Sequence, residues 1–99
     1  MQTQNEILKF LKDNKQYLQK NFHLTKIGLF GSYAKNEQLV NSDIDLLIEL
    51  EDNTPDIFEL KQNLRNYLKS RLNIKVDICR EKYIKPYIKD KILKETIYV

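Results

Sequence analysis

The sequence has 99 residues, 41% of them apolar and 31% charged, and a formal net charge of +3 at pH 7. This length and balance predict one compact domain over residues 1–99 and argue against a largely disordered chain. No apolar run approaches the roughly 20 residues that a membrane-spanning helix needs, and the small positive charge does not by itself indicate nucleic-acid binding.

The first third of the chain predicts a helix followed by a strand. Apolar residues between Gln4 and Lys20 fall mostly at helical spacing, which is typical of an amphipathic helix. Leu24–Phe30 is a short apolar run that ends at Gly31, so a buried strand is favoured there. His23 precedes this strand and is expected in a loop, outside any site.

A short helical turn and a polar loop should lead to the second strand. Ser32 is a favourable N-cap for a turn that continues through Lys35, and residues 36–41 form a polar loop. Asp43–Leu50 alternates between apolar and mainly acidic positions, which predicts a strand with one acidic face. Glu49 shares that face, where we expect it to have a structural role.

The second half predicts a long helix, a third strand, another helix and a closing strand. Thr54-Pro55 is a typical helix start with Pro at the first helical position, and it precedes an apolar stripe of Ile57, Leu60, Leu64, Leu68 and Leu72. Ile74–Cys79 alternates like a strand and places Asp77 opposite its apolar side. Pro86–Leu93 has a helical pattern, and Thr96–Val99 could close the sheet.

These elements predict an α/β (α+β) fold in which helices cover a small mixed sheet. Lys82–Lys94 should form an amphipathic segment over a sheet edge, and a solvated lysine face is favoured over RNA contact. Tyr83, Tyr87 and Tyr98 could form a partner surface, although core packing is the favoured interpretation.

Ligand chemistry is restricted by the single cysteine, Cys79, and the single histidine. An internal disulfide is excluded, and a structural zinc site would need more Cys and His ligands than are present. The lone cysteine favours a reducing cytoplasm. Any metal must therefore be held by carboxylates.

Three aspartates form the most informative pattern. Asp43 and Asp45 are two apart on one strand, so their side chains point to the same side with Cα atoms about 6.6 Å apart. Asp77 on another strand could complete a site for Mg²⁺ or Mn²⁺, because these ions prefer oxygen ligands. Two such ions can assist an in-line phosphoryl displacement, and Asp77 could also receive the proton of the attacking hydroxyl.

A phosphate-binding turn is predicted just upstream. Gly31 lets the backbone approach a ligand closely, and Ser32 with the amides of Tyr33 and Ala34 would offer donors to a triphosphate. With metal at one end and amides at the other, the α-phosphorus could be attacked while pyrophosphate leaves.

Gly31-Ser32, the ten residues 33–42, Asp43-x-Asp45 and the later Asp77 resemble the nucleotidyltransferase signature of the DNA polymerase beta superfamily. The stretches GLFGSYAKNEQLVNSDIDLLIEL and VDICREKYIKPYIKDKILKETIYV are similar to minimal nucleotidyltransferases encoded beside HEPN-domain proteins. The resemblance covers the whole chain and implies a polymerase beta-like palm.

What this resemblance implies is an antitoxin that transfers AMP from ATP to a tyrosine of a HEPN ribonuclease toxin and assembles with it. Asp43, Asp45 and Asp77 would bind magnesium and act in catalysis. The nucleotide would contact Gly31, Ser32, Tyr33 and Lys35. Direct nucleic-acid binding is not expected.

The chain departs from the family at Lys35-Asn36, where members commonly have Arg-Gly. Lys35 keeps the charge without a bidentate fork, and Asn36 tolerates the left-handed conformation that Gly adopts. Two other functions stay open: an antitoxin that acts by binding alone, and a transferase acting on RNA or on a small molecule.

Overall fold

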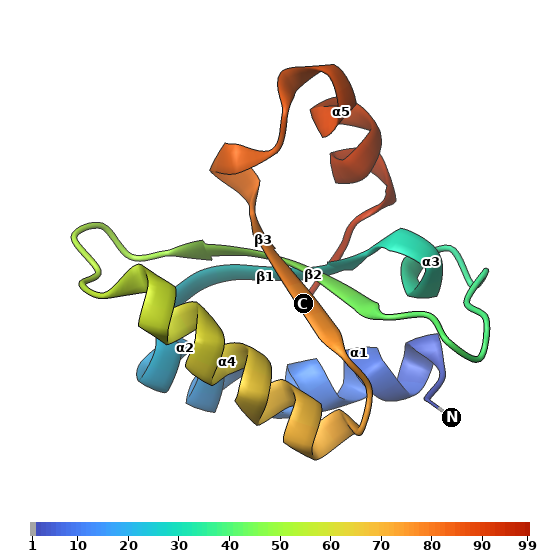
Figure 1. The fold of residues 1–99 in the computed structure, drawn as a ribbon, viewed down its shortest axis with the longest axis horizontal. Helices are drawn as coiled ribbons and strands as arrows, with labels where there is room; N and C mark the ends of the chain where they lie inside the picture. Colours follow the sequence, from blue (N-terminus) through green and yellow to red (C-terminus); the bar gives the residue numbers. More distant parts are fainter. Residues whose placement is uncertain (1) are drawn as a thin grey trace.

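The computed structural model describes residues 2–99, which fold around a four-stranded mixed sheet (Figure 1). The strand order is β3-β2-β1-β4, with β1 antiparallel to both β2 and β4 and β3 parallel to β2. The strands are β1 (Leu24–Phe30), β2 (Ile44–Leu50), β3 (Val76–Arg80) and β4 (Ile97–Tyr98). The predicted mixed sheet is confirmed.

Helices lie on both sides of this sheet. Figure 1 shows α1, α2 and α4 beneath one face and α5 above the other. The bounds are α1 (Gln4–Asp13), α2 (Lys15–Phe22), α3 (Gly31–Ala34), α4 (Ile57–Leu72), the 3₁₀ turn η1 (Glu81–Tyr83) and α5 (Pro86–Glu95). Across residues 2–99, every helix is too short or too polar to cross a membrane.

The core lies between the sheet and α1, α2 and α4. Alternate residues of the strands point to this side, as the predicted periodicity requires, and they pack against an apolar stripe on each helix. The fully buried members include Ile7, Leu11, Leu18, Leu29, Ile44, Leu46, Ile48, Leu64, Leu68 and Val76. By contrast, α5 has no buried residue.

One predicted helix is two helices in the structure. The chain bends at Asn14, whose φ of −103° and ψ of 8° are not helical. The Phe10 carbonyl accepts from the Asn14 backbone amide at 3.0 Å and also from the Asn14 side chain at 2.8 Å, so Asn14 closes the end of α1. The bend lets α1 and α2 follow the twisted sheet as separate segments.

Two predicted helix starts are wrong by a few residues. Thr54-Pro55 forms a turn, in which Thr54 Oγ1 donates to the Glu51 carbonyl, and α4 begins only after Asp56 in the left-handed region. Ser32 is not an N-cap, because the positive φ of Gly31 starts the turn one residue earlier. Pro86 does occupy the first turn of α5, as predicted.

Core packing was the wrong interpretation for three tyrosines. Tyr83, Tyr87 and Tyr98 are 69%, 79% and 42% exposed. Their segments lie on the face away from the main core, where the sheet offers mostly polar groups and little apolar surface to bury them.

Candidate active site

Two of the predicted aspartates are neighbours across the sheet. Asp45 of β2 pairs directly with Asp77 of β3 in the parallel ladder, so their side chains emerge on the same face, opposite α1, α2 and α4. Asp43 lies just before β2, two residues from Asp45. Tertiary structure therefore brings together residues that are 32 positions apart in the sequence (77 − 45).

Gly31 lies directly against this acidic pair. Phe30, the last residue of β1, pairs with Asp45, so the chain turns at Gly31 beside the Asp45 carboxylate. Gly31 has a φ of 74°, and a β-carbon there would collide with that carboxylate. Both the backbone angle and the close approach therefore require glycine.

The Asp45 carboxylate is partly buried and lies near two other negative charges. Its pKa is raised to about 6, first by burial and then by the negative charges of Asp77 and Asp43. A cation at this face would offset both effects, because it favours the ionised form. The three carboxylates would offer oxygen donors, and such a donor set fits Mg²⁺ or Mn²⁺.

The three aspartates are not gathered into a finished cage. Within residues 2–99, no three His, Cys, Asp or Glu side chains are arranged around one metal position. Asp43 Oδ2 lies 3.8 Å from Lys75 Nζ. Metal binding by the three aspartates stays a prediction.

The predicted phosphate-binding residues lie in α3 and just after it. The Tyr33 side chain is 1% exposed and belongs to the core, so only its amide could face a ligand. Ser32 is partly exposed, and Lys35 Nζ lies 3.8 Å from Glu95 Oε2 of α5. Asn36 has a φ of 56°, which confirms that it adopts the left-handed conformation expected of it.

One contributor to this turn was missed from the sequence. Gln4 of α1 donates through Nε2 to the carbonyl oxygens of Tyr33 and Ala34, at 3.2 and 2.7 Å, and so holds α3 in place. No local pattern could indicate it, because Gln4 reads as a polar position near a helix start.

Glu49 has the structural role that was expected. It accepts from Arg80 Nε at 3.1 Å and from the Lys82 amide at 2.9 Å, which ties β3 and η1 to β2. Because β3 carries Asp77, this tether helps keep the acidic pair in register.

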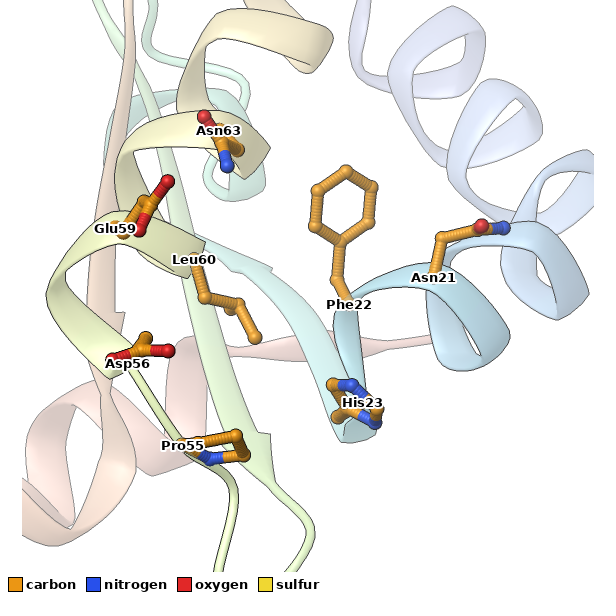
Figure 2. A pocket seen from close by; sticks show the side chains of 8 residues that line it. All are labelled: Asn21, Phe22, His23, Pro55, Asp56, Glu59, Leu60 and Asn63. Carbon is orange, nitrogen blue, oxygen red and sulfur yellow. The ribbon is translucent and has the colours of Figure 1, made fainter.

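A pocket on the helical side is separate from the acidic face. Figure 2 shows it between the end of α2 and the start of α4, with Phe22 and His23 on one side and Leu60 on the other. Asp43, Asp45 and Asp77 are not among its lining residues, so this pocket takes no part in binding at the acidic face.

Comparison with known proteins identifies the family. Residues 5–99 match the nucleotidyltransferase domain. A Methanocaldococcus jannaschii protein, provisionally named a protein adenylyltransferase, is 43% identical over 100 residues, which is 100% of both chains. The protein adenylyltransferase MntA of Thermococcus cleftensis is 33% identical over 99 residues, covering 100% of this chain and 98% of that protein.

Solved structures agree with these relatives. A structure described provisionally as a minimal nucleotidyltransferase matches with a TM-score of 0.79 at 26% identity, over 97% of this chain and 95% of the other. A toxin–antitoxin complex with AMP-PNP matches with a TM-score of 0.66 at 28% identity, over 98% and 72%. The tri-AMPylated HEPN toxin of Shewanella oneidensis in complex with an MNT antitoxin matches with a TM-score of 0.56 at 25% identity, over 96% and 66%. The chain therefore belongs to the nucleotidyltransferase domain family, as a minimal nucleotidyltransferase enzyme whose relatives are named protein adenylyltransferases.

Proposed function

We propose that this chain transfers AMP from ATP to a hydroxyl of a HEPN-domain toxin, most readily a tyrosine, and thereby acts as its antitoxin in the cytoplasm. The observation that carries the proposal is the in-register pair Asp45 and Asp77 beside Gly31. Relatives named protein adenylyltransferases, and a similar complex whose toxin carries AMP, support this substrate and acceptor.

Asp43, Asp45 and Asp77 would hold Mg²⁺. When bound, the ion would supply charge stabilisation for the phosphates and for the attacking and leaving oxygens. The raised pKa of Asp45 supports this role, because a nearby cation would stabilise the ionised form of a carboxylate that is partly buried beside other negative charges.

The turn after β1 would hold the triphosphate. The first amides of a helix have no partner within it, so those of Ser32 and Tyr33 are free to donate to phosphate oxygens. Gly31 allows the close backbone approach, and Lys35 adds a positive charge after release from Glu95. At four residues α3 is too short for a sizeable macrodipole, so we attribute the binding to these individual donors.

The acceptor hydroxyl oxygen would form a bond to the α-phosphorus while the bond from that phosphorus to the bridging oxygen breaks. Pyrophosphate would leave with the electron pair, and Asp77 would receive the hydroxyl proton. The residues mainly hold the reacting atoms in line, which removes much of the entropic barrier.

The test is incubation of the chain with labelled ATP, Mg²⁺ and a HEPN-domain protein, taken from the adjacent gene where that gene encodes one. We expect label on that protein with the unaltered chain and with Asp52→Asn, an exposed acidic control, and none with Asp45→Asn. Absence of transfer with any nucleoside triphosphate would refute the enzymatic proposal. If Asp45→Asn still forms the complex and still rescues growth of cells that express the toxin, then binding alone neutralises the toxin.

A further inference from the structure

A second surface lies at the open edge of the sheet, where β4 is the last strand. Val99 N donates to the Ile27 carbonyl at 3.1 Å, and Ile97 and Tyr98 pair with Leu29 and Gly28. Because backbone groups alternate in direction along an antiparallel strand, the Tyr98 N–H and C=O point away from β1. This edge therefore presents a donor and an acceptor to an incoming strand.

Next to this edge runs a groove of about 670 Å³, within the usual range for ligand sites. Leu8 of α1 and Ile97 and Val99 give it an apolar lining. The Tyr98 side chain is held on the other face, where its hydroxyl donates to Glu81 Oε1 at 3.1 Å. The edge is thus ordered before any partner arrives.

Lysines line the helical side of the groove. Lys9, Lys12 and Lys15 contribute to its lining. Lys9 Nζ is paired with Asp13 at 2.6 Å, whereas Lys12 and Lys15 form no ion pair within residues 2–99. Two lysines without a carboxylate partner beside an apolar groove leave a positive rim.

We propose that an extended acidic segment of another protein binds here as an added strand beside β4. Its backbone would pair with Tyr98, and its helix-side residues would meet first Leu8 and then the lysines. Residues of the added strand that point to the same side lie two positions apart. We therefore expect the segment to contain an apolar residue followed two positions later by Asp or Glu. A second copy of this chain is disfavoured, because β4–β4 pairing would bring two lysine sets together.

The probe is the acetylated, amidated hexapeptide Thr-Val-Thr-Glu-Thr-Glu, titrated into the ¹⁵N-labelled full chain. We expect shifts confined to the amides of residues 97–99 and of the groove-facing part of α1. A peptide N-methylated along its backbone keeps the side chains but cannot pair as a strand, and it should lose binding at least about tenfold. A peptide in which both Glu residues are replaced by Lys should lose affinity by a similar factor.

Two charge variants complete the test. Lys12→Glu with Lys15→Glu should weaken the peptide about tenfold or more, and the milder Lys12→Gln with Lys15→Gln about threefold, given the modest strength of exposed ion pairs. The control Lys20→Glu with Lys69→Glu makes the same charge change on other helix surfaces and should leave affinity within about twofold.

Three results would overturn the proposal: no shift of residues 97–99 at millimolar peptide, equal binding of the N-methylated peptide, or dimerisation of the free chain through β4. AMP transfer is measured in parallel. Because none of the three aspartates lines the groove, loss of the peptide site with transfer intact separates this proposal from the proposed function.

Discussion

At position 31, the backbone conformation and the neighbouring carboxylate both require glycine. Its φ of 74° is costly for any side chain, and the Asp45 carboxylate occupies the space where a β-carbon would lie. Asp45 itself is held in a partly buried position next to two like charges. Asp45 is therefore expected to lower stability in exchange for activity.

Gly31→Ala should destabilise the chain by about 1–3 kcal/mol through backbone strain and displacement of Asp45, and should abolish AMP transfer. Urea unfolding gives the first quantity and labelled transfer the second. Asn36→Gly is the matched control: φ is also positive there, but Asn tolerates it, so stability should change by less than about 0.5 kcal/mol. Equal effects at the two positions would contradict the role assigned to Gly31.

Asp45 predicts an unusual pH dependence for the metal-free chain. Its folded pKa of about 6 exceeds the ordinary 3.8, so the folded state binds the proton more tightly and its stabilising contribution is lost as pH rises from about 4 to 6. After discounting for solvent screening, the loss should be on the order of 1 kcal/mol.

Asp45→Asn should lack this loss, and in the presence of a chelator at pH 7 it should unfold at higher urea than the unaltered chain. Added Mg²⁺ should stabilise the unaltered chain and leave Asp45→Asn unchanged. If the unfolding free energy of the two proteins depended on pH in the same way, the pKa of Asp45 would not be raised by folding.

At the scale of elements, β3 is an edge strand that depends on side-chain ties. Arg80 and Glu49 are largely buried, with 9% and 18% of their side chains exposed, and their contact joins β3 to β2. The exposed pair Lys9–Asp13, with 76% and 57% exposed, joins residues within one helix. Burial decides which pair matters, because water screens the second and not the first.

Glu49→Gln should therefore cost about 2–3 kcal/mol of unfolding free energy, since it leaves the Arg80 charge poorly compensated. Asp13→Asn, the control, should cost less than about 0.5 kcal/mol. Hydrogen exchange should report faster opening of β3 in Glu49→Gln alone. Similar costs for both variants would mean that the buried pair does not hold the strand.

At the scale of the whole molecule, the 99 residues build a sheet and its covering helices and little more. Under the proposed function, we expect acceptor recognition to come mainly from the partner's own surface. We expect kcat/KM for AMP transfer to the folded HEPN protein to exceed that for a tyrosine-containing peptide by on the order of 100-fold, since remote contacts supply binding energy. Comparable values for the two acceptors would place the recognition within this chain.

The sequence by itself determined the strands and helices with strong periodicity, because alternation and helical spacing reflect which side of each element is buried. It also determined the candidate residues, since Gly31-Ser32 and Asp43-x-Asp45 are local patterns with a definite spacing. The left-handed conformation of Asn36 was expected from the glycine that family members carry there, because Asn tolerates it.

Only the tertiary structure decided how distant residues meet. The register of Asp45 with Asp77, the contact of Gly31 with Asp45, and the support of α3 by Gln4 depend on strand pairing and packing across long sequence separations. The bend at Asn14 and the exposed tyrosines likewise depend on what each segment finds opposite it. Local spacing carries no information about such neighbours, because they are selected by the burial of the whole chain.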